Sequence, residues 1–179
     1  MAQIKWISKV NGDWNTAANW QGGVVPGVND DVIINVTGAN PVITIPDGLD
    51  VTVKSITSVE KLVVDGSLTV TTGNSTLNGE LVVNPNKYLQ VKDTANLVAN
   101  GATTANGASL YAENGGKLNL PALTSYDGGY DYNPTYIQAS GIGSEVNLPN
   151  VTSFVGRSGE YYWPSRTEVN ALAQGKINL

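Results

Sequence analysis

The feature that most constrains the fold is a recurrence of short strand-like segments at a fixed distance. The segments "SLTV", "YLQV" and "SLYA" share the form x-apolar-x-apolar, and their leucines Leu68, Leu89 and Leu110 lie 21 residues apart. Ile137 and Val169 continue this series at longer intervals. A fixed period of this length is typical of repeat architectures, in which each repeat stacks on its neighbours.

Two further series run beside the first at nearly constant offsets. The second contains Leu77, Leu97, Leu118, Val146 and Ile177, and the third contains Leu81, Ala102, Leu123 and Val151. Three strands in each repeat predict a coil in which every turn adds one strand to each of three stacked sheets. The predicted fold is therefore an all-β, parallel β-solenoid with about 21 residues per turn, right-handed by the general preference of parallel crossovers.

A nine-residue unit supports this register. "LNLPALTSY" (118–126) recurs as "VNLPNVTSF" (146–154), and "VTVKSITSV" (51–59) shares its apolar pattern. We interpret these as equivalent copies whose apolar residues stack inside the coil, while Asn119, Asn147 and Asn178 form an outward ladder of amides. An antiparallel sandwich with similar strands is the alternative.

The composition narrows the classes of function. The chain has no Cys and no His, which excludes disulfides, thiol chemistry and imidazole bases. A net charge of −5 with only 10 Lys and Arg residues provides no basic surface for nucleic acid. The apolar runs are also too short to span a membrane. Asp30 and Asp31 could offer oxygen ligands to Ca²⁺, but we favour backbone acceptors in a turn and predict no cofactor.

The later turns are longer than the earlier ones, and the extra length falls at one corner. Leu123 and Ile137 are 14 residues apart, and Val151 and Val169 are 18 apart, where earlier turns use eight. The expanded corners are "DGGYDYNP" (127–134) and "VGRSGEYYWPSR" (155–166), which should lie side by side. Solenoids commonly carry function on loops inserted at one face.

These corners combine aromatic rings with charged groups, a usual way to hold a sugar. The candidate ligand-binding residues are Tyr130, Asp131, Tyr132, Arg157, Glu160, Tyr161, Tyr162, Trp163 and Arg166. The alternative is that the rings cover the apolar edge of the coil. Tyr126 and Tyr136, which flank the first loop, are expected to be structural.

The two ends depart from the period. Residues 1–50 keep strand-like segments but not the spacing, so we predict an N-terminal cap with Trp6, Trp14 and Trp20 as its apolar lid, followed by solenoid turns over 51–179 in one structural domain. The sequence stops in mid-turn at Leu179, which leads us to expect further repeats of a longer parent chain, or self-association at this open end.

The stretch "GDWNTAANWQGGVVPGVNDDVIIN" (12–35) resembles the opening segment of large bacterial extracellular β-helical proteins, including autotransporter-like and adhesin-like passengers. The matching residues are Gly12, Trp14, Asn19, Trp20, Gly23, Pro26, Asp31 and Val32. This resemblance implies an extracellular or cell-surface location and a structural or adhesive role.

Two functions from different classes follow. The first is a non-enzymatic, rigid extracellular module that contacts a polysaccharide or cell-surface glycan through the aromatic corner. The second is a β-helix carbohydrate-active enzyme, a polysaccharide lyase or glycoside hydrolase, with carboxylates or an Arg base at the corner. We favour the first, because all candidate catalytic groups lie in Gly-containing loops, whereas catalysis needs fixed geometry. We name no catalytic residue.

Overall fold

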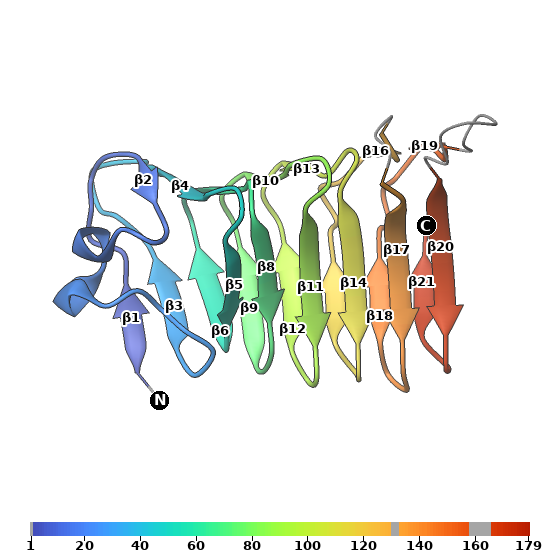
Figure 1. Ribbon diagram of the computed structural model, residues 1–179, viewed down its shortest axis with the longest axis horizontal. Coiled ribbons are helices and arrows are strands. Elements are labelled where there is room, and N and C mark those ends of the chain that lie inside the picture. Colours follow the sequence, from blue (N-terminus) through green and yellow to red (C-terminus); the bar gives the residue numbers. More distant parts are fainter. Residues whose placement is uncertain (1, 130–132, 158–165) are drawn as a thin grey trace.

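The protein is an elongated stack of short parallel strands. The computed structural model describes residues 2–129, 133–157 and 166–179. Figure 1 shows the strands side by side along the long axis, from β1 near the N-terminus to β20 and β21 at the other end. All strand pairs in these ranges are parallel, apart from an isolated antiparallel bridge between Trp6 and Trp20. The parallel solenoid is confirmed, and the antiparallel sandwich is wrong.

Three long sheets form the sides of the coil. The eight-stranded sheet contains β1 (Gln3–Lys5), β3 (Asp31–Ile34), β6 (Ser55–Ser58), β9 (Asn74–Leu77), β12 (Asn96–Ala99), β15 (Lys117–Asn119), β18 (Glu145–Asn147) and β21 (Lys176–Asn178). The six-stranded sheet contains β5 (Asp50–Val53), β8 (Ser67–Val70), β11 (Tyr88–Lys92), β14 (Ser109–Glu113), β17 (Thr135–Ser140) and β20 (Thr167–Leu172). The five-stranded sheet contains β2 (Gly12–Asp13), β4 (Val42–Ile45), β7 (Lys61–Val64), β10 (Leu81–Val83) and β13 (Thr103–Thr104).

The third side changes in the last turns. There the strands β16 (Ser125–Asp127) and β19 (Ser153–Val155) form a separate two-stranded sheet. From β3 onward the chain visits the three sides in constant order, one strand each per turn. The core is the line of inward apolar residues, and Leu68, Leu89, Leu110 and Ile137 on the six-stranded sheet are all fully buried.

The first predicted series is in register throughout. Leu89 lies opposite Leu68 and Leu110, and Ile137 lies opposite Leu110 and Val169. The second series is correct from Leu97 onward, through Leu118, Val146 and Ile177.

Leu77, however, does not pair with Leu97 as predicted. It lies opposite Ala99, while Ser75 lies opposite Leu97. A shift of two residues leaves the alternation of buried and exposed positions unchanged, so the sequence pattern cannot detect it.

The third series and the third copy of the nine-residue unit need correction. Leu81 pairs with Thr103 rather than with Ala102, and Leu123 and Val151 precede the strands β16 and β19 instead of lying in them. Units 118–126 and 146–154 are equivalent, since Leu118 pairs with Val146 and Tyr126 with Phe154. Unit 51–59 begins on β5 of the six-stranded sheet, whereas units 118–126 and 146–154 begin on β15 and β18 of the eight-stranded sheet. Unit 51–59 is therefore not equivalent to them, and its likeness is a coincidence of short apolar patterns.

The N-terminal end is closed by a tryptophan cluster. Trp6, Trp14 and Trp20 are at most 2% exposed. The ring of Trp20 contacts those of Trp6 and Trp14 edge-on, at centroid distances of 5.0 and 4.8 Å. The short 3₁₀ helices η1 (Ala17–Asn19) and η2 (Gln21–Gly23) carry the chain over this end. The predicted lid is thus present, and the segment 1–50 also contains paired strands, because β3 and β4 align with β6 and β7.

Two Asn-Gly turns, Asn78-Gly79 and Asn100-Gly101, have a clear reason for their glycine. A Cβ on Gly101 would lie 1.9 Å from the carbonyl oxygen of Gly79 in the preceding turn, and a Cβ on Gly79 would lie 2.1 Å from the carbonyl oxygen of Glu60. Only glycine permits such close approach of successive turns. The neighbouring Asn100 donates to Asn78 across the same step at 2.9 Å.

Candidate functional site: the enlarged corner

The enlarged corner is built on paired strands. The inserted residues lie between β16 and β17 in one turn and between β19 and β20 in the next. Because β16 pairs with β19 and β17 with β20, the bases of the two insertions lie side by side, as the sequence predicted. Figure 1 places this corner at one edge of the C-terminal half of the coil.

Four side chains lock the bases of the insertions, and we call Asp127, Thr135, Arg157 and Thr167 the clamp. Arg157 Nε donates to Asp127 Oδ1 at 2.8 Å, and its Nη2 donates to Asp127 Oδ2. This bidentate ion pair joins residues of neighbouring turns and fixes the guanidinium plane. Its groups are partly shielded, with 20% of the Arg157 side chain and 34% of the Asp127 side chain exposed.

The two threonines complete the clamp. Thr135 Oγ1 lies 3.2 Å from Thr167 Oγ1 and 3.3 Å from the Gly128 carbonyl oxygen. The backbone N–H of Arg157 donates to Thr167 Oγ1 at 3.1 Å, and the N–H of Thr167 donates to the Arg157 carbonyl at 2.9 Å. Each insertion is therefore closed by its own hydrogen bonds, and the hydroxyl pair joins one insertion to the other.

Gly128 has no side chain because the clamp occupies that space. A Cβ at this position would lie 1.8 Å from Thr167 Oγ1 and 3.2 Å from Thr135 Oγ1. Sequence reasoning missed both threonines. The signal that could have found them is their matching place one turn apart in "TYIQA" and "TEVNA", since Thr135 and Thr167 are paired in register.

The electrostatics keep Asp127 ionised. Hydrogen bonding from the Arg157 guanidinium, aided by the N–H of Gly129, lowers the pKa of the Asp127 carboxyl below its ordinary value of 3.8. A carboxyl group in this state is a poor proton donor at neutral pH.

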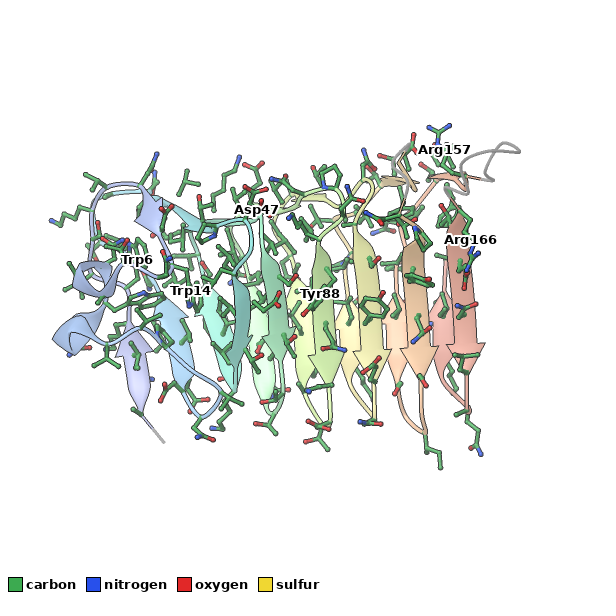
Figure 2. All side chains as sticks on the ribbon, in the orientation of Figure 1. Trp6, Trp14, Asp47, Tyr88, Arg157 and Arg166 are labelled. Carbon is green, nitrogen blue, oxygen red and sulfur yellow. The ribbon has the colours of Figure 1, made fainter. Side chains whose placement is uncertain are left out.

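Arg166 is not part of the clamp. Its guanidinium pairs with Glu168, two residues further along the chain, and this pair raises the pKa of Arg166. Hydrogen bonding from Asn170, followed by that from Arg166, lowers the pKa of Glu168. Asn170 also donates to Glu168, at 3.1 Å. Figure 2 shows Arg157 at the top of the corner and Arg166 lower, directly before the strand β20. The two predicted arginines therefore serve different local networks.

A shallow cavity of about 230 Å³ lies against the clamp. It is lined by Pro85, Asn86, Asn106, Gly107, Asp127, Gly128 and Gly129. Asn106 Oδ1 accepts from the Asp127 N–H at 2.9 Å, which holds this side chain at the cavity wall. The cavity thus combines the apolar ring of Pro85, the side-chain amides of Asn86 and Asn106, and glycine backbone. This combination suits a small polar ligand such as a sugar residue.

The other predicted site residues are Tyr130, Asp131, Tyr132, Glu160, Tyr161, Tyr162 and Trp163, and they lie outside the described residues. Both flanking tyrosines were expected to be structural, and Tyr126 is buried as expected, whereas Tyr136 is partly exposed and stacks on Tyr111 at 6.2 Å. Tyr126 is 1% exposed, stacks on Phe154 at 5.3 Å and donates its hydroxyl to the Ala108 carbonyl at 2.7 Å.

The adjacent aspartates at the start of β3, Asp30 and Asp31, have protein partners. Asp30 Oδ2 accepts from the Gly27 N–H at 2.9 Å, and Asp31 binds Lys54 at 2.8 Å and Ser55. Within the described ranges there is no cluster of three or more His, Cys, Asp or Glu side chains able to hold a metal ion.

The outward amide ladder is real but short. Asn147 donates to Asn119 at 3.0 Å, whereas Asn178 donates to Glu145 at 2.8 Å instead of continuing the ladder. Among the helices in the described part of the chain, none is long and apolar enough to cross a membrane.

The N-terminal motif has structural roles in the described fold. Trp14 and Trp20 are buried in the end cluster, and Asn19 donates to the Asp13 carbonyl at 3.2 Å. Gly12 lies against Asn19, since a Cβ there would be 2.5 Å from Asn19 Nδ2. This motif therefore builds the closed end of the coil.

Comparison with known proteins places the chain in a family. Neither a curated protein nor a solved structure matches it. A family model described as "Domain of unknown function (DUF8693)" matches residues 5–165, which include the tryptophan cluster, the coil up to β19 and most of the enlarged corner. The chain therefore belongs to this family, DUF8693.

Proposed function

We propose that the chain is a non-enzymatic, rigid module of a bacterial extracellular or cell-surface repeat protein, and that its enlarged corner contacts glycans. The observation that carries this proposal is the clamp, which joins the bases of two insertions from successive turns and holds them side by side. Rigid presentation of inserted loops by a solenoid is the usual way in which such folds form binding surfaces.

The geometry favours binding over catalysis. Asp127 of the corner is engaged by Arg157, and Glu168 on the adjoining strand β20 is engaged by Arg166 and Asn170, so both carboxylates have structural partners. The lowered pKa of Asp127 also opposes a role as general acid. Asp131 and Glu160 lie outside the described residues, and the activity assay below tests them.

The glycan contact is supported by the composition of the corner. The inserted segments contain Tyr130, Tyr132, Tyr161, Tyr162 and Trp163 in the sequence. Aromatic side chains bind the apolar faces of sugar rings, while neighbouring polar groups bind the hydroxyls. The cavity beside the clamp adds amide groups from Asn106 and Asn86 to this set.

The experiment is a binding and cleavage assay with neutral and uronate polysaccharides. We expect binding without new reducing or unsaturated ends, and loss of binding in Trp163→Ala. Val10→Ala is the control, because Val10 is 71% exposed at the opposite end of the coil. Cleavage that disappears in Asp131→Asn or Arg166→Ala would establish the enzyme instead. Failure of the wild type to bind any polysaccharide would refute the glycan contact.

A further inference from the structure

A row of tyrosines crosses the outer face of the six-stranded sheet. Tyr88 on β11, Tyr111 on β14 and Tyr136 on β17 lie on three adjacent strands, and we call them the tyrosine strip. The ring centroids of Tyr88 and Tyr111 are 6.1 Å apart, and those of Tyr111 and Tyr136 are 6.2 Å apart. The strip therefore runs along the coil axis. Figure 2 shows Tyr88 on the broad face of the coil.

These rings are on the outside by register. The inward positions next to them are Leu89, Leu110 and Ile137, each fully buried in the core. Alternation along a strand then directs Tyr88, Tyr111 and Tyr136 outward, where all three are partly exposed. Partly exposed phenol rings in contact over three successive turns provide an apolar surface on an otherwise polar face.

The neighbours of the strip are amides and hydroxyls held in place. Gln90 Nε2 donates to Glu113 at 3.0 Å, and Thr69 Oγ1 donates to Gln90 Oε1 at 3.2 Å. Gln138 lies opposite Tyr111 in register, so an amide flanks the strip on that strand as well. Oriented amides beside aromatic rings provide donors and acceptors for sugar hydroxyls at low entropic cost.

Charges of both signs lie beside the strip. Lys92 and Glu113 are register partners on β11 and β14, and Arg166 is paired with Glu168 beside β17. Opposite charges placed close together give no strong field for a polyanion or a polycation. The chemistry is thus suited to a neutral ligand.

The strip begins where the enlarged corner ends. Tyr136 directly follows Thr135 of the clamp, and its backbone N–H donates to Ser109 Oγ at 3.0 Å. A ligand bound at the corner can therefore continue onto the sheet face without leaving the protein surface.

We propose that the tyrosine strip binds a neutral polysaccharide chain that extends from the enlarged corner along the coil axis. The sugar rings contact Tyr88, Tyr111 and Tyr136, and the hydroxyls bond to Gln90 and Gln138. This inference rests on the proposed function, because it names the class of glycan that the module binds and the surface that binds it.

The test uses oligosaccharides of a neutral β-glucan in increasing length, with titration calorimetry on the whole protein. We expect the affinity to rise with the length of the oligosaccharide until it covers the rings of all three tyrosines. Tyr111→Leu, which keeps apolar bulk but removes the ring, is expected to weaken binding about tenfold. Tyr111→Phe keeps the ring and is expected to bind like the wild type. Asn119→Ala, on the outer face of the eight-stranded sheet, is the matched control and should also bind normally.

The outcomes separate this inference from the proposed function. Equal binding by wild type and Tyr111→Leu, together with loss in Trp163→Ala, would overturn the strip and leave the corner as the glycan site. Binding of a uronate polymer in preference to the neutral one would overturn the ligand class. Absence of binding to every polysaccharide would overturn both. A purely structural strip would lower the melting temperature in Tyr111→Leu without any change in affinity.

Discussion

The stacked leucines make a quantitative prediction at Leu89. Leu89 is fully buried between Leu68 and Leu110 of the adjacent turns. Leu89→Ala removes three carbons, and at about 0.8 kcal/mol per buried methylene the transfer loss is about 2.4 kcal/mol. The cavity left between two rigid neighbours adds to this loss, so we expect a total of about 3–4 kcal/mol. The melting temperature should fall by roughly 10 °C.

The assay is urea unfolding followed by far-UV circular dichroism at 25 °C, with thermal melts in parallel. Leu172→Ala is the matched control, because it is the same chemical change at a side chain that is 46% exposed on β20. Its cost should stay within about 1 kcal/mol. A loss at Leu89 below about 1 kcal/mol, or no larger than that of the control, would refute the stacked core.

Three further predictions concern the clamp, a turn and the N-terminal lid. The wild type should be more stable than Asp127→Asn at neutral pH and should lose this advantage in acid. Because the pKa of Asp127 in the folded protein lies below 3.8, the difference in unfolding free energy is full above that pH and shrinks as the pH falls below it. An advantage that persists unchanged to pH 2 would contradict the ion pair. Gly101→Ala should cost more than about 2 kcal/mol, since its Cβ meets a backbone carbonyl oxygen at 1.9 Å, whereas Gly156→Ala, with open space around it, should be nearly neutral by the same denaturation assay. Trp20→Phe removes the 2.6 Å bond from Trp20 Nε1 to the Trp14 carbonyl and should cost about 2 kcal/mol, measured as loss of thermal stability; an unchanged melting temperature would argue against the lid.

Much of the fold was predictable because each turn of the coil repeats the same spacing of buried apolar residues in the sequence. Leu68, Leu89 and Leu110 recur at the spacing of one turn, and their register is the one observed. The enlarged corner was predictable for the same reason, since an insertion changes the spacing at one place only.

Register errors mark the limit of this reasoning. Leu77 and Ala99 form the observed pair, while the pattern suggested Leu77 and Leu97. Both choices place apolar residues inside, because the side-chain period of a strand is two and a shift by two residues leaves it unchanged. The backbone hydrogen bonds between turns decide which of the two registers forms. The identity of a single apolar residue does not decide it.

The sequence by itself determined that this chain is a parallel β-coil with an elaborated corner. Only the tertiary structure decided which polar groups meet there. Asp127 and Arg157, which are 30 residues apart, form the ion pair of the clamp because β16 pairs with β19 and so brings them to adjacent turns. The predicted register already placed Tyr88, Tyr111 and Tyr136 on adjacent strands, but the tertiary structure decided that their rings meet. The physical reason is that contact between outward side chains depends on how each side chain is oriented, and the apolar pattern of the core does not specify this orientation.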